Sequence, residues 1–222
     1  MKYVITSKIA LTCLCIFWEF NLLASIPNDS VSTRYEKGDF ITYNHIVVNA
    51  PREIVNEVMR DFIYQTKYDL NGLYNWGLKG LRLRKENDDL LVFNFKSTNY
   101  DAQNDIIKNT GDVHVSPLIT FPNIHVNTRM TKKDSANGTS KVDIALLYSD
   151  SFLKKTTGQF HMTPLNENYC LISLETKVRF GWFFDVFITT KNYSGIMQWR
   201  FTKLMQNIAA EAERRAARIK KN

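Results

Sequence analysis

The chain has 222 residues, of which 44% are hydrophobic and 23% are charged. This balance excludes an intrinsically disordered chain, and the length suits one large domain or two small ones. Aromatic residues make up 13% of the sequence, which supports a large core or a core that also lines a pocket.

The N-terminal residues 1–25 have the pattern of a secretory signal peptide. Two lysines precede a short apolar stretch at 9–17, and the small residues Ala24 and Ser25 offer a cleavage point. The stretch is too short to span a membrane comfortably, and Glu19 interrupts it. The sequence therefore predicts a secreted or periplasmic protein, and the alternative is a protein anchored in a membrane by an uncleaved segment.

Residues 26–38 are rich in polar residues and predict a polar leader, while no later stretch has the composition of a linker. Residues 39–222 are therefore expected to form one domain. Two of the three cysteines lie in the signal segment, which leaves Cys170 and no internal disulfide. Cys170 falls on the apolar face of an alternating stretch, which favours a buried structural side chain over a reactive nucleophile.

The domain begins with a predicted strand at about 40–49 that leads directly into a helix started by Pro51. Apolar residues recur at helical spacing as far as Phe62, and a second short helix or turn region is expected over 63–79. From Gly80 onward the apolar residues alternate with polar ones, which predicts a hairpin with its turn at Asp88-Asp89.

Residues 97–123 are rich in Asn and Asp and contain two prolines, so irregular structure is expected there. Short strands are expected around 106–107 and 113–115 within it. Because a long loop in a compact domain is often functional, we interpret the segment as a flap over a pocket entrance.

Four alternating stretches follow, at 124–131, 142–148, 156–163 and 169–180. Each places apolar residues on one side, which is typical of an antiparallel sheet packed on one face. The chain closes with a predicted amphipathic helix from about Tyr193 to about Arg218.

This order of elements resembles that of the START-like (SRPBCC, helix-grip) superfamily. The resemblance is carried by Ile-Val-Val-Asn-Ala-Pro at 46–51, where the first strand enters the first helix, and by the long strand 169–180 with Gly181 and the closing helix. It covers nearly all of the mature chain. It implies an α+β helix-grip fold, in which a curved antiparallel β-sheet wraps around a long C-terminal α-helix and two short helices follow the first strand.

What the resemblance further implies is a deep cavity between the sheet and the C-terminal helix. Relatives bind lipids, sterols, quinones, polyketides or plant hormones, and some are cyclases or co-chaperones, so the fold alone does not fix the function. The favoured interpretation is non-catalytic binding or transport of a lipid or another hydrophobic small molecule. The alternatives are an enzyme of the polyketide cyclase or aromatase type and a protein-binding module of the co-chaperone type.

A lipid site requires mostly apolar walls, and the inward positions of the predicted strands and helix supply them. The same residues would equally serve a closed core. The predicted pocket-lining residues are Phe93, Phe95, Val126, Met130, Ile144, Leu146, Tyr148, Phe160, Met162, Ile172, Leu174, Met197, Trp199 and Phe201.

No catalytic residue and no cofactor is predicted. The four histidines show no metal-binding spacing, and the motifs of nucleophilic hydrolases and nucleotide-binding proteins are absent from the sequence. For the cyclase alternative, Tyr148 and His161 are the polar residues considered for a role in the pocket.

The net charge is +7, and five cations crowd the last nine residues. Such a tail favours either peripheral contact with anionic lipid or a solvated helix end whose cations complement the helix dipole. No nucleic-acid partner is expected, because the aromatic residues lie mainly at apolar strand positions rather than among the basic ones. The five cations are Arg214, Arg215, Arg218, Lys220 and Lys221.

Overall fold

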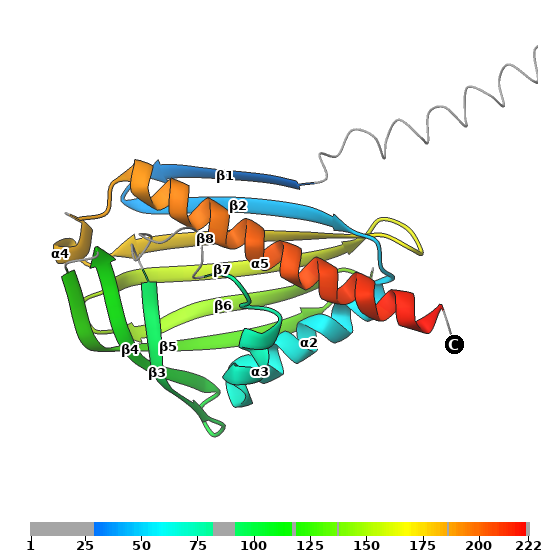
Figure 1. Cartoon of the computed structure of the whole chain (residues 1–222), viewed down its shortest axis with the longest axis horizontal. Helices are drawn as coiled ribbons and strands as arrows, with labels where there is room; N and C mark the ends of the chain where they lie inside the picture. Colours follow the sequence, from blue (N-terminus) through cyan, green and yellow to red (C-terminus); the bar gives the residue numbers. More distant parts are fainter. Residues whose placement is uncertain (1–28, 82–91, 117–118, 137, 186, 221–222) are drawn as a thin grey trace, which may run out of the picture.

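The structure is a computed structural model that describes residues 29–81, 92–116, 119–136, 138–185 and 187–220. The predicted signal peptide and the predicted turn at Asp88-Asp89 lie outside these residues. Within them, one eight-stranded antiparallel sheet is covered on one face by helices, and the strand order is β1-β2-β8-β7-β6-β5-β4-β3 (Figure 1). The predicted α+β helix-grip architecture is confirmed.

The strands from β3 onward follow one another as a meander, and the β1–β2 hairpin joins the sheet where β2 pairs with β8. The strands are β1 (Asp29–Glu36), β2 (Asp39–Val48), β3 (Val92–Asp101), β4 (Ile106–Ser116), β5 (Ile119–Asp134), β6 (Ser140–Ser149), β7 (Leu153–Pro164) and β8 (Cys170–Phe180). The helices are α2 (Arg52–Tyr68), α3 (Leu70–Asn75), α4 (Trp182–Asp185) and α5 (Thr190–Ile219).

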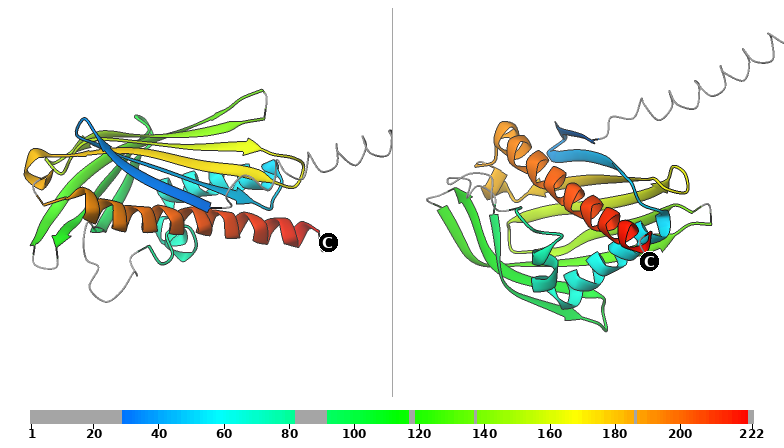
Figure 2. Two further views of the ribbon diagram at one scale, coloured as in Figure 1. Left: turned by 90° about the horizontal axis from the view of Figure 1, so that it is seen from above. Right: turned by 45° about the vertical axis from the view of Figure 1, so that its right-hand side comes forward.

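Helix α5 runs diagonally across the β1–β2 side of the sheet, and α2 and α3 lie beside it on the same face (Figure 2). Helix α5 contacts β1, β2 and α2, whereas α2 contacts β3 and β7. The three helices thus leave part of the inner face of the sheet without a helix directly on it.

The ends and faces of the two long helices follow from their sequences. Pro51 precedes α2 and Glu53 lies in its first turn, where a negative charge is favourable. The Thr189 side chain caps α5 by accepting a hydrogen bond from the Asn192 N–H at 3.2 Å. The buried side chains of α2 are Ile54, Val55, Val58, Met59 and Phe62, as predicted.

Strand β8 shows the sheet pattern most clearly, because every second side chain from Cys170 to Phe180 is buried. The inner face of the sheet carries two buried clusters. One packs β2, β7 and β8 against α2 and the C-terminal half of α5. The other gathers aromatic rings around Phe40, Phe180 and Tyr193 near the N-terminal end of α5.

The expectation of irregular structure at 97–123 is wrong, although the two short strands expected around 106–107 and 113–115 both lie within β4. The segment contains the end of β3, all of β4 and the beginning of β5. The turn between β3 and β4 is stabilised by Asp101, which accepts hydrogen bonds from the Asn104 N–H at 3.2 Å and from Lys108 Nζ at 2.9 Å. Bulges in the β3–β4 and β4–β5 ladders interrupt the alternation of the sequence, so the strands lack the simple period of two.

The segment 26–38 contains a strand that was not predicted. Strand β1 pairs antiparallel with β2 along its whole length. Its polar residues find partners across the ladder, since Ser30 Oγ lies 3.0 Å from His45 Nδ1 and the Thr33 and Thr42 hydroxyls lie 3.0 Å apart. No helix in the described part of the chain has the length and apolar character needed to cross a membrane.

Gly181 ends β8 at a place where a larger residue does not fit. Its N–H donates to the Phe152 carbonyl at 3.0 Å, and a Cβ atom there would lie 1.7 Å from the Ser151 carbonyl oxygen. We expect Gly181→Ala to lower the free energy of unfolding by about 1–3 kcal/mol, as measured by the urea midpoint. Gly158→Ala is the matched control, because a Cβ there would lie at an ordinary 3.4 Å from Ile144; an equal loss in both variants would contradict the prediction.

Candidate ligand-binding cavity

The uncovered part of the inner face forms an apolar cavity of about 360 Å³, which we call the main cavity. Helices α2 and α3 form one wall, and strands β3 to β6 form the other. Its lining has three polar side chains and none that is charged. The lining residues are Phe62, Thr66, Leu70, Leu73, Leu78, Phe93, Phe95, Asn109, Val126, Thr128, Met130, Ile144, Phe152 and Leu153.

A second space of about 270 Å³, which we call the side cavity, continues toward α5. Phe93, Ile144, Phe152 and Leu153 line both cavities, so the two meet at these side chains. The other side-cavity residues come from β7, β8 and α5. They are Thr156, Thr157, Gly158, Thr176, Val178, Phe180, Tyr193, Met197 and Phe201.

Two of the three polar residues of the main cavity make hydrogen bonds within the protein. The Thr66 hydroxyl donates to the Phe62 carbonyl of its own helix at 2.7 Å. Asn109 Oδ1 accepts from the Thr98 hydroxyl at 2.9 Å. These contacts leave the wall of the main cavity suited to an apolar surface.

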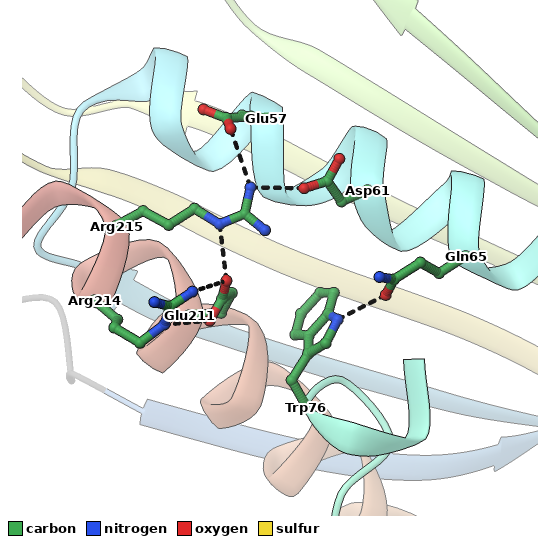
Figure 3. Close-up of polar contacts among 7 residues, drawn as sticks. All are labelled: Glu57, Asp61, Gln65, Trp76, Glu211, Arg214 and Arg215. Carbon is green, nitrogen blue, oxygen red and sulfur yellow. Dashed lines mark hydrogen bonds and ion pairs between the residues drawn. The ribbon is translucent and has the colours of Figure 1, made fainter. Parts of the chain in front are cut away.

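A cluster of ion pairs fixes α5 to α2 (Figure 3). Arg215 Nη1 of α5 lies 2.6 Å from Asp61 Oδ2 and 3.2 Å from Glu57 Oε1, both on α2. Its Nε donates to Glu211 Oε1 at 2.8 Å, and Arg214 binds the same carboxylate. The hydrogen bonds from Arg214, with those from Arg215, hold the pKa of Glu211 below its ordinary value.

The segment after α3 is held by three further hydrogen bonds, which two side chains donate. Trp76 Nε1 donates to Gln65 Oε1 of α2 at 2.7 Å (Figure 3). Asn207 Nδ2 of α5 donates to the carbonyls of Gly77 at 3.1 Å and Lys79 at 2.8 Å. The helical wall of the cavities is therefore tied together at three places.

The ion pairs change the interpretation of the basic tail. Two of its five cations, Arg214 and Arg215, are engaged with carboxylates. Arg218 and Lys220 are exposed. Contact of this tail with a membrane stays a prediction.

Seven of the predicted pocket residues line the cavities. Phe93, Phe95, Val126, Met130 and Ile144 line the main cavity, while Met197 and Phe201 line the side cavity. Four others are packed in the core rather than exposed to either space. These are Phe160, Met162, Ile172 and Leu174.

The remaining three predicted residues lie outside both linings. Leu146 is half-buried on the inner face, opposite Thr128, and Trp199 is half-buried on α5. Tyr148 lies on the outer face, because a bulge at Leu147 shifts the register so that Tyr148 pairs with Asn127. It is 52% exposed.

The two polar residues considered for a cyclase role are thus both outside the cavities. The Tyr148 hydroxyl donates to Asp150, and this hydrogen bond raises the pKa of Tyr148. His161 is exposed on the outer side of β7, between the buried Phe160 and Met162.

Several lining residues were not predicted as such, because they come from helices and a turn. Phe62, Leu70 and Leu73 were expected only as helix core. Phe152 lies in the connection from β6 to β7, and Leu153 is the first residue of β7. Helical spacing identified the apolar face of α2, but it contains no information on whether that face meets a strand or a cavity.

Cys170 is buried beneath the helices, as expected. Burial raises the pKa of its thiol to about 11, so the thiolate is scarcely populated near neutral pH. Among the described residues, no three His, Cys, Asp or Glu side chains are grouped where they could hold a metal ion.

An outer groove of about 320 Å³ lies between the end of α2, α3 and β3, and Leu70 and Phe95 line both this groove and the main cavity. Two lysines border the groove. Lys67 Nζ lies 2.7 Å from Asp105 Oδ1, and Lys96 Nζ lies 2.7 Å from Asp112 Oδ1. Both cations are therefore neutralised by neighbouring carboxylates.

The arrangement of a curved antiparallel sheet and a long C-terminal helix also occurs in solved structures. The STAR-related lipid transfer protein of Xanthomonas axonopodis superposes with a TM-score of 0.51 at 12% identity, covering 85% of this chain and 95% of that one. The chain has the START-like, helix-grip fold. The Zhui aromatase/cyclase of Streptomyces sp. R1128 has the same START-like fold, with a TM-score of 0.50 at 13% identity, covering 80% of this chain and 95% of that one.

No model of a known protein family matches the sequence, and no curated protein matches it. The two START-like structures differ in what they do, since one is named for lipid transfer and the other for catalysis. At these identities the similarity shows the fold, which the sequence resemblance predicted, and the function must be argued from the cavities.

The lowered pKa of Glu211 gives a pH test of the ion-pair cluster. Because the folded state lowers this pKa below the ordinary 4.5, the contribution of Glu211 to stability is complete above that pH and is lost as the pH falls through the folded-state pKa. We expect Glu211→Gln to be less stable than the wild type at pH 7, and the difference to shrink toward pH 3. Urea midpoints across this range measure it.

Glu167→Gln is the control for this series. Glu167 is exposed in the turn between β7 and β8 and has no ion pair among the described residues. The urea midpoint of Glu167→Gln should equal that of the wild type at every pH. A difference between Glu211→Gln and the wild type that stays constant with pH would refute the role of the Glu211 carboxylate.

Proposed function

We propose that the protein binds an apolar small molecule, such as a lipid, in the main cavity and the adjoining side cavity. The observation that carries this proposal is the wall of the main cavity, which is apolar apart from three side chains and has no charged lining residue. Its volume of about 360 Å³ lies within the range of roughly 300–1,000 Å³ that is typical of small-molecule sites.

Burial of the ligand supplies the binding energy in this proposal. Each methylene removed from water contributes about 0.8 kcal/mol, so ten methylenes contribute about 8 kcal/mol before the cost of ordering the ligand. That cost is at least about 4 kcal/mol. A ligand must therefore fill much of the cavity to bind well, and a chain of a few carbons does not suffice.

We also place the entrance between α3 and β3. Leu70 and Phe95 separate the main cavity from the outer groove, and Phe95 is 39% exposed although it lines the apolar space. An outward shift of these two side chains would connect the cavity with solvent without disturbing the ion pairs between α2 and α5.

The first test is native mass spectrometry of the protein purified without detergent, followed by organic extraction of whatever is bound. We expect an apolar molecule to co-purify or to be taken up from a series of linear alcohols of increasing length. Affinity should rise about fourfold for each added methylene, which corresponds to about 0.8 kcal/mol, until the cavities are full. Failure of the wild type to take up any member of the series would contradict the proposal.

A substitution where the cavities meet tests their position. Ile144 lines both cavities, so Ile144→Trp should fill the junction and reduce the affinity for the longer alcohols by at least about tenfold, since a loss of two or three buried methylenes suffices. Thr131→Trp is the matched control, because Thr131 is exposed on the outer face of β5. Both variants are first checked for a cooperative urea transition.

A further inference from the structure

The side cavity differs from the main cavity in having hydroxyl groups whose hydrogen bonds are not made within the protein. Tyr193 and Thr176 both line it. Tyr193 is 0% exposed and Thr176 is 8% exposed, and neither the Tyr193 hydroxyl nor Thr176 Oγ1 has a hydrogen-bond partner in the described part of the chain. Buried polar groups without partners are rare in folded proteins and require an explanation.

The two hydroxyls belong to one place in the fold. Thr176 of β8 is the direct register partner of Thr42 on β2. The Thr42 hydroxyl also lies near the Tyr193 hydroxyl, where its hydrogen-bonding character lowers the Tyr193 pKa and so offsets part of the rise caused by burial. Thr42 also lies 3.0 Å from the Thr33 hydroxyl, and its approach to the Tyr193 hydroxyl does not complete a well-formed hydrogen bond.

The Tyr193 ring is held firmly by its aromatic neighbours. It stacks on Phe40 with ring centroids 4.2 Å apart and meets the edge of Phe180 at 6.0 Å. Burial raises the pKa of Tyr193 above its ordinary value, so the phenol stays protonated and retains a proton to donate. A fixed donor at the wall of an apolar cavity has the properties of an orienting group for a ligand.

The charge of the lining restricts the ligand further. No lining residue of the side cavity is charged. An ionised carboxylate or phosphate would be buried here without a countercharge, which is strongly unfavourable. A ketone, ester, ether or alcohol oxygen would instead accept hydrogen bonds from the two hydroxyls.

We propose that Tyr193 and Thr176 form a polar end of the side cavity that binds an uncharged oxygen, such as a carbonyl or hydroxyl group, of an otherwise apolar ligand. This inference rests on the proposed binding function and names the ligand class: a neutral molecule with one polar end, rather than a fatty-acid anion or a pure hydrocarbon. The apolar remainder of the ligand extends past Ile144 and Phe152 into the main cavity.

Three naphthalene derivatives of similar shape test the proposal on the full protein: a naphthyl methyl ketone, the alkene in which CH₂ replaces the ketone oxygen, and the naphthoate anion. We expect Tyr193→Phe and Thr176→Val each to weaken ketone binding by about fivefold, the loss that corresponds to one net hydrogen bond. Their affinity for the alkene should stay unchanged or rise. Naphthoate should bind the wild type at least tenfold more weakly than the ketone.

Two surface variants provide the same chemical changes elsewhere. Tyr169→Phe and Thr131→Val remove hydroxyls at exposed positions, and their ratio of ketone to alkene affinity should equal that of the wild type. All variants are compared at temperatures well below their thermal transitions, so that loss of folding is not mistaken for loss of binding.

The outcomes separate the two proposals. Binding of the alkene together with a ketone affinity that is insensitive to both cavity variants overturns the polar end and leaves the apolar site standing. Equal losses for ketone and alkene also overturn it, because they indicate a change of packing. Tight binding of naphthoate overturns the restriction to uncharged ligands, and failure of the wild type to bind either neutral probe overturns the binding function itself.

Discussion

The inner face of the sheet is wider than the helices laid across it. Eight strands at about 4.8 Å spacing span roughly 34 Å, whereas a helix with its side chains is about 10 Å across. Helix α5 covers the β1–β2 side, and α2 and α3 cover part of the other side. The cavities are the space that remains between them, so their existence follows from this mismatch rather than from any single residue.

A cavity of this kind is stable only if the helices around it are held in place. The apolar stripes of α2 and α5 hold the helices against the sheet, since each buries side chains in the larger core cluster. Arg215, with Glu211 on its own helix and Asp61 on α2, then fixes how the two helices meet. Because these charges are partly exposed, we regard them as setting geometry more than supplying energy.

The sequence predicted the elements whose pattern is regular. Strand β8 alternates without interruption from Cys170 to Phe180, and α2 repeats its apolar residues at helical spacing. The second half of β3 and the continuity of β4 were missed, because bulges and an Asn/Asp-rich turn obscure their alternation. The bulge at Leu147 likewise turned Tyr148 to the outside. A period of two identifies the inner face, but whether a side chain there meets a helix or open space depends on where the helices cross, which no local pattern specifies.

Cys170 lies at the start of β8 with its side chain fully buried in the larger core cluster. A thiol in that position reacts with an alkylating reagent only after the region above it has opened. The labelling rate of the peptide that carries Cys170 therefore measures how often the helices lift from the sheet. A ligand that occupies the cavities would slow this labelling by the factor with which it stabilises the state in which the helices pack on the sheet. The labelling rate of this one native side chain would therefore report local opening of the fold.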